Sequence, residues 1–162
     1  MPHRKTLVVS SAIVLTAAAV AHSTHAAQLP DYAKTLAELV PTGGAGGSGN
    51  AWVQVVTILG NPSLPGPYSQ LLKVAPHAQI AAHHHAGDRV GTVLQGTWMF
   101  GYGPSFDKAR LRILPVGSVY TEPSDGAHFA ATGDEAATVL ITGLGPTNTV
   151  YENPADDPTA QQ

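Results

Sequence analysis

The chain has 162 residues, contains no Cys and carries a formal net charge of −3. This length suits one domain with one hydrophobic core, and the missing Cys excludes disulfides and a lipid-anchored cysteine. Because the sequence shows no basic patch and no basic amphipathic helix, we expect neither nucleic acid nor, in the mature form, a membrane as a partner.

The first 26 residues have the pattern of a bacterial export signal. Residues 1–6 (MPHRKT) are basic, and residues 7–21 (LVVSSAIVLTAAAVA) form an apolar run that is short for a bilayer span. Small residues at Thr24 and Ala26 predict cleavage after Ala26. We therefore expect a periplasmic or secreted protein with a cleaved signal peptide (1–26); an uncleaved membrane anchor is the alternative.

Two further segments flank the predicted domain. Residues 27–50 form a flexible N-terminal segment, because the Gly/Ser-rich stretch 42–50 (TGGAGGSGN) cannot pack a core. Within it, residues 29–41 (LPDYAKTLAELVP) could hold a short helix with Asp31 as its cap. At the other end, residues 153–162 lack large apolar side chains, which predicts a disordered tail.

Between these segments the chain reads as short β segments separated by turn residues. Apolar and polar residues alternate over 109–115 (ARLRILP), as in a half-exposed strand, and Gly96 is a candidate tight turn. About eight or nine strands and no helix after residue 50 predict an all-β sandwich or barrel. The expected strands are 51–59, 68–75, 89–95, 97–103, 109–115, 118–123, 127–132, 136–143 and 148–154.

Three consecutive histidines, 83–85, are the most informative polar feature. On an extended segment side chains alternate, so His83 and His85 point to one face and His84 to the other. A third imidazole would have to come from His77, in a turn where it should be solvated, or from His128, which enters an apolar strand after a turn. We favour His128, although the tract alone leaves a metal site and a surface feature both open.

With His128 included, the pattern resembles two motifs of the cupin superfamily. Motif 1 (G-x5-H-x-H-x3-4-E-x6-G) is matched by His83, His85 and Gly96. Motif 2 (G-x5-P-x-G-x2-H-x3-N) is matched by Gly117, Pro123 and His128. The resemblance implies a double-stranded β-helix, the cupin jelly-roll barrel, over residues 51–152. It also implies a divalent metal ion held by His83, His85 and His128.

The departures from the motifs concern the metal site itself. Arg89 stands where the family has its Glu ligand, and a guanidinium cannot ligate a cation because it does not deprotonate. If the site holds a metal ion, a nearby carboxylate must then offset the positive charges of the ion and the guanidinium. Asp88 is adjacent but should face away, whereas Glu122 could face the cavity as a fourth ligand or as the partner of Arg89. A surface Arg–Glu pair is the open alternative. In addition, His77 replaces a Gly of motif 1 and Thr132 the final Asn of motif 2.

The resemblance implies a metal-dependent enzyme acting on a small organic molecule, similar to the three-His cupin dioxygenases. Fe(II) is the expected ion, with Zn(II), Mn(II) and Ni(II) as alternatives, and Arg89 and Glu122 are the candidate catalytic residues. A non-catalytic cupin that binds or senses a small molecule is the second hypothesis, and a domain with a degenerate site the third. By analogy with related cupins, the apolar strand 52–59 could pair across a homodimer.

Overall fold

The computed structural model describes residues 31–41 and 49–160. The predicted signal peptide, its cleavage point and most of the Gly/Ser-rich stretch lie outside the described residues. The chain divides into two units, 1–33 and 34–162, and every β-strand described here belongs to the second. Within the described residues, no helix has the length and apolarity needed to cross a membrane.

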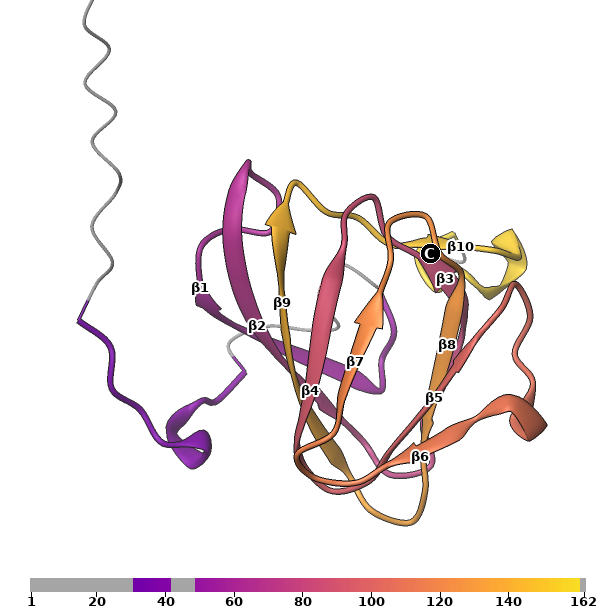
Figure 1. The fold of residues 1–162 in the computed structure, drawn as a ribbon, viewed down its shortest axis with the longest axis horizontal. Helices are drawn as coiled ribbons and strands as arrows, with labels where there is room; N and C mark the ends of the chain where they lie inside the picture. Colours follow the sequence, from indigo (N-terminus) through magenta and orange to yellow (C-terminus); the bar gives the residue numbers. More distant parts are fainter. Residues whose placement is uncertain (1–30, 42–48, 161–162) are drawn as a thin grey trace, which may run out of the picture. The chain divides into compact units, whose positions relative to one another are not determined.

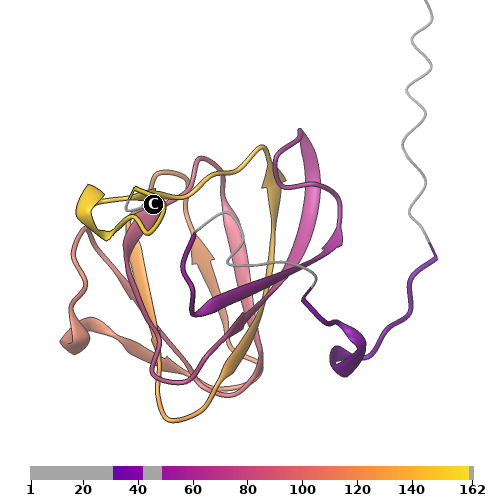
Figure 2. The same cartoon turned by 180° about the vertical axis from the view of Figure 1, so that it is seen from behind.

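Two five-stranded antiparallel sheets form the domain, as the sequence predicts for an all-β sandwich or barrel. In Figures 1 and 2 the sheets face each other, with β9, β4 and β7 in one layer and β3, β8 and β5 in the other. The first sheet runs in the order β1 (Val53–Leu59), β2 (Gly66–Val74), β9 (Ala137–Gly145), β4 (Arg89–Gln95), β7 (Val119–Glu122). The second runs in the order β10 (Val150–Tyr151), β3 (Gln79–His84), β8 (His128–Thr132), β5 (Trp98–Tyr102), β6 (Arg112–Leu114).

Most predicted strands are present, and β4 has the predicted bounds. The segment 109–115 is an exception, because it begins in a 3-10 helix (η3, Lys108–Arg110) and only its second half pairs with β5. In the segment 148–154 only Val150–Tyr151 is a strand, and it is followed by another 3-10 helix (η4, Pro154–Asp156). The predicted disorder of the tail stays a prediction.

The predicted N-terminal helix is a single 3-10 turn (η1, Leu36–Glu38). Its cap is Thr35 and not Asp31: the Glu38 carboxylate accepts hydrogen bonds from the Thr35 backbone N–H and hydroxyl, both at 2.7 Å. The Glu38 carboxylate thus satisfies the backbone N–H of Thr35 at the start of the turn.

The core lies between the inner faces of the two sheets, where alternate residues of each strand point. Tight approaches across the first sheet depend on glycine. Gly91 pairs with Tyr120 in the β4–β7 ladder, and a Cβ at Gly91 would lie 2.2 Å from Tyr120 Cζ. At the β4–β5 turn, Gly96 has φ +71°, which confirms the predicted tight turn. The main buried core residues are Tyr68, Val74, Val93, Trp98, Phe100, Tyr120, Ala130, Val139 and Ile141.

The ring of Tyr120 should make Gly91 intolerant of any side chain. We expect Gly91→Ala to lower the free energy of unfolding by about 1–3 kcal/mol, because the added methyl overpacks a close-packed interior. Urea denaturation measures this change. Gly133→Ala is the matched control, since a Cβ at Gly133 meets nothing within 4 Å. Equal unfolding midpoints for the two variants would contradict this packing.

Candidate metal site

A β-bulge in β3 turns His83 into the space between the sheets. Ile80 pairs with Ala130 and His83 with His128, so three steps along β3 match two steps along β8. Without the extra residue, strand alternation would send Ile80 inward and His83 outward. With it, both side chains face inward and are buried. The bulge also supplies an acceptor, because His83 Nδ1 lies 2.8 Å from the Ala81 carbonyl oxygen.

Two loops hold the other imidazoles at the end of the strands. His85 follows β3, and its Nδ1 lies 2.5 Å from the carbonyl oxygen of Asn148, whose side chain accepts from the Ala86 N–H at 3.0 Å. His128 begins β8, and its Nδ1 lies 2.9 Å from the Gly126 carbonyl oxygen. A hydrogen bond from the Asp125 N–H to the His85 carbonyl joins the loops. Each ring orientation is therefore determined by backbone acceptors.

These contacts determine which ring nitrogen can bind a cation. A carbonyl only accepts, so all three Nδ1 atoms must carry the hydrogen, and all three Nε2 atoms present lone pairs. The three rings offer ligand nitrogens within 4.8 Å of one another. His128 Nε2 is buried and has no hydrogen-bond partner among the described residues. A buried acceptor without a partner needs an explanation, and a cation supplies one.

The imidazoles are also in the protonation state that metal binding requires. Burial lowers the pKa of His83 to about 4, with a smaller effect from the neighbouring His128 ring. Burial likewise lowers the pKa of His128, and burial together with the Arg89 charge lowers that of His85. All three rings are neutral at pH 7, so no proton has to leave before a cation binds.

An ion pair from the first sheet faces the three rings. Arg89 and Glu122 are direct partners in the β4–β7 ladder, and Arg89 Nε donates to Glu122 Oε2 at 2.6 Å. Arg89 Nη2 contacts the same oxygen and donates to His85 Nε2 at 2.6 Å. Glu122 Oε2 also lies 3.6 Å from Nε2 of both His85 and His128. Glu122 thus points towards the imidazoles as the partner of Arg89, which is one of the arrangements considered from the sequence.

Comparisons with known proteins bear on the fold. Neither the family models nor the curated proteins searched match the chain. A solved structure, the polyketide cyclase RemF from Streptomyces resistomycificus, superposes with TM-score 0.52 at 19% identity, covering 68% of this chain and 80% of that one. The chain has the cupin fold.

Two further cupin-fold neighbours are longer proteins. The salicylate 1,2-dioxygenase from Pseudaminobacter salicylatoxidans matches with TM-score 0.52 at 12% identity, over 64% of this chain and 31% of that one. The DMSP lyase DddQ from Ruegeria pomeroyi matches with TM-score 0.50 at 16% identity, over 59% and 48%. This chain therefore spans less than half of each, and the likeness at these identities concerns the fold alone.

Two residues that depart from the cupin motifs, His77 and Thr132, lie at or beside the turn before β3. His77, at the Gly of motif 1, has φ +57°, a conformation that a non-glycine residue rarely adopts. Its side chain is exposed, as expected. Thr132, at the Asn of motif 2, accepts from the Ala78 N–H at 2.9 Å and donates to the Ala75 carbonyl at 2.6 Å. The Thr132 hydroxyl thus ties β8 to the turn before β3.

The remaining candidates lie away from the three rings. His84 points to the opposite face of β3, as alternation predicts, and its Nδ1 lies 2.6 Å from Glu152 Oε1. Asp88 is exposed, and its carboxylate accepts from the Ser124 N–H at 2.7 Å, so it stabilises the loops instead of facing the cavity. Glu122 is the only one of the two proposed carboxylates that reaches the imidazoles.

A cross-strand row that the sequence analysis did not identify supports the ion pair. Tyr68, Gly143, Arg89 and Glu122 are successive register partners across β2, β9, β4 and β7. Because Gly143 has no side chain, the Tyr68 ring lies over it: a Cβ at Gly143 would be 2.9 Å from the Tyr68 hydroxyl. In this row Arg89 therefore lies between Gly143, which has no side chain, and its ion-pair partner Glu122.

A cavity of about 180 Å³ opens beside the candidate site. His83, His85 and Arg89 line one side of it, and apolar side chains from β1, β2 and β3 line another. The apolar residues are Val53, Val55, Leu72 and Ile80, and the remaining lining comes from Pro62, Ser63, Gln70, Thr147, Asn148 and Thr149. This volume is below the range of about 300–1,000 Å³ usual for drug-sized ligands. The cavity therefore suits a small molecule, with the charged group of Arg89 available to it.

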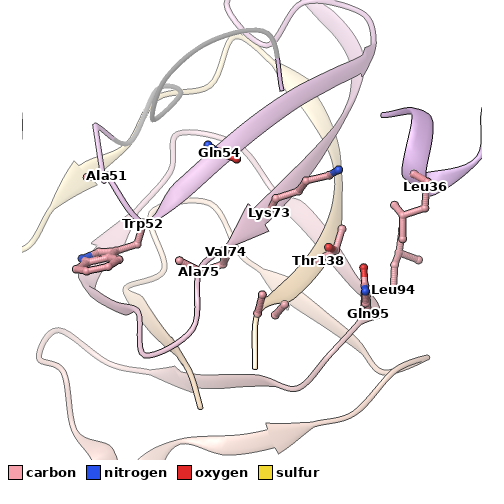
Figure 3. A pocket seen from close by; sticks show the side chains of 13 residues that line it. Leu36, Ala51, Trp52, Gln54, Lys73, Val74, Ala75, Leu94, Gln95 and Thr138 are labelled. Atoms are coloured by element: carbon pink, nitrogen blue, oxygen red, sulfur yellow. The ribbon is translucent and has the colours of Figure 1, made fainter. Parts of the chain in front are cut away.

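A larger hollow, of about 910 Å³, lies on the outer face of the first sheet (Figure 3). It is lined by the outward row Gln54, Lys73, Thr138 and Gln95, which are register partners, and by Trp52 and Leu94. No imidazole or carboxylate lines it. The groups able to bind a metal are therefore at the inner cavity and not in the larger hollow.

The Arg89–Glu122 pair should be costly to break. The side chains are 11% and 4% exposed, so we expect Glu122→Ala to lower the free energy of unfolding by about 3–5 kcal/mol, because a guanidinium is left without its counter-charge. Guanidinium chloride denaturation measures this loss in the free energy of unfolding. The double variant Arg89→Met/Glu122→Leu removes both charges and should recover most of the loss. If the double variant were as unstable as the single one, shape and not charge would explain the effect.

Proposed function

We propose that this cupin binds one divalent metal ion through Nε2 of His83, His85 and His128. The observation that carries the proposal is the shared orientation of the rings: each Nδ1 is held by a backbone carbonyl, so the lone pairs converge. Metal-binding histidines are held in this way by a hydrogen bond at the second ring nitrogen. Imidazole donors suit Fe, Zn and Ni ions, and Glu122 brings a negative charge close to them.

The activity we propose is a metal-dependent reaction on a small organic molecule, of the dioxygenase type. Bound Fe(II), the favoured ion, would offer open coordination positions at which O₂ and a chelating substrate are activated; Zn(II), Mn(II) and Ni(II) are the alternatives. Apolar side chains form part of the cavity wall, and Arg89 provides a planar fork for a carboxylate or enolate. The similar structures include a dioxygenase, a lyase and a cyclase, so proteins with this fold can be enzymes that act on small organic molecules. Which reaction a given protein catalyses depends on the residues of its site and not on the fold.

Metal content tests the first part of the proposal. Protein purified without a His tag should bind about one equivalent of metal, since three protein nitrogens with an open position form a catalytic-type site. We expect His83→Ala to weaken binding by more than about 100-fold, because even the loss of an outer-shell contact costs 10–100-fold. His84→Ala is the matched control from the same strand and should bind as the wild type does. Elemental analysis and isothermal titration measure both; equal binding by the two variants would refute the assignment.

A non-catalytic binding or sensing cupin is the second candidate, and the hydrogen bond from Arg89 to His85 Nε2 favours it, because it engages a nitrogen that catalysis needs. Oxygen uptake separates the two. With Fe(II) and a panel of diketones and phenolic ketones, we expect the wild type to consume O₂ with one of them and His83→Ala to consume none. Tight capture of a panel member without its consumption would establish the binding function instead.

Export belongs to the same proposal and rests on residues 1–26 alone. An N-terminal sequence beginning at Ala27, on protein recovered outside the cytoplasm, would support it.

A further inference from the structure

The guanidinium of Arg89 makes the contacts that a bound cation would make. Its Nη2 donates to His85 Nε2 at 2.6 Å and contacts Glu122 Oε2. Its Nε donates to the same carboxylate oxygen at 2.6 Å. One side-chain cation thus engages both an imidazole lone pair that faces the site and the carboxylate nearest to the other rings.

These contacts exclude metal binding at the same nitrogen. The Nε2 atom of a neutral imidazole has a single lone pair, so His85 can accept from Arg89 or ligate a metal ion but cannot do both. Two cations side by side in a buried site would also repel each other strongly. Any ion held by all three rings must therefore displace Arg89 from His85.

A displaced Arg89 needs a new partner close by. The residue lines the cavity of about 180 Å³, and its side chain is only 11% exposed, so water cannot fully solvate it there. If the incoming ion also attracts Glu122, whose Oε2 is 3.6 Å from two of the ligand nitrogens, the guanidinium loses its counter-charge. A carboxylate is the group whose geometry matches the guanidinium fork.

We propose that Arg89 is a built-in competitor of the metal ion, and that a small carboxylate ligand releases the metal site by pairing with Arg89. This inference rests on the metal site proposed above and names the ligand class as a monocarboxylate with a compact apolar body. The cavity volume of about 180 Å³ limits the ligand to a small molecule, Arg89 provides the partner for its carboxylate, and Val53, Val55 and Leu72 provide apolar contacts for its body beside the polar part of the lining. Metal and carboxylate should then bind cooperatively, each tightening the other by the same factor.

Zinc titrations of the full mature chain test the coupling, with a chromogenic chelator as competitor. For the wild type we expect benzoate to tighten Zn(II) binding about tenfold, within the usual range for coupled sites, and the neutral isostere benzamide to have no effect. For Arg89→Gln we expect tighter Zn(II) binding without benzoate, because the competing cation is gone, and no response to benzoate. Arg89→Lys, which keeps the charge but not the fork, should bind Zn(II) weakly and respond little to benzoate.

The possible outcomes separate this inference from the proposed function. If wild type and Arg89→Gln bind Zn(II) equally well, Arg89 does not compete and the inference is wrong while the metal site stands. If benzoate still tightens binding in Arg89→Gln, the carboxylate acts on the ion and not through Arg89, which also overturns the inference. If no variant with intact far-UV circular dichroism binds Zn(II), the proposed metal site itself is wrong.

Discussion

One extra residue in β3 is the constraint on which the candidate site depends. The bulge between Ile80 and His83 resets the alternation of the strand, so the apolar residue that packs the core and the imidazole both face inward. The same irregularity exposes the Ala81 carbonyl that orients the His83 ring. A regular strand would leave His84 as the inward residue and bring a single imidazole to the site from β3.

The two sheets contribute different chemistry to the space between them. The second sheet and the loops at its end supply three neutral imidazoles, whereas the first sheet supplies the only charged pair in contact with them among the described residues. The pair lies in one row of the sheet with Gly143 and Tyr68, so the charges are placed by strand register and not by flexible loops. Register is strongly specified where one face is buried, which fixes the backbone positions from which Arg89 and Glu122 extend.

The sequence carried enough information for most of the strands, though not for β3, and for the fold and the convergence of His83, His85 and His128, because alternation and motif spacing are local or nearly local signals. It also offered Glu122 as a residue that could face the imidazoles, with a surface pair as the alternative. The bulge in β3 could not be predicted, since Ala81 and Ala82 leave no signal in the alternation of apolar residues. The row from Tyr68 to Glu122 could not be predicted either, because it depends on the register between strands that are distant in the chain. The 3-10 turn at Lys108–Arg110 was missed because it depends on local hydrogen bonds.

The presence of Arg at position 89 and Glu at position 122 has a direct electrostatic consequence. A cupin with Glu at the position of Arg89 would place a carboxylate on β4; here the carboxylate lies on β7, at the neighbouring ladder position, and still reaches two imidazoles at 3.6 Å. The guanidinium pairs with it, so Arg89 and Glu122 offset each other's charge within the buried cluster. This pairing avoids the cost of an unpaired buried charge. Binding of a metal ion then depends on its competition with Arg89 and on the supply of a carboxylate ligand that pairs with Arg89. A site with an unpaired buried carboxylate would instead depend on the ion for its stability.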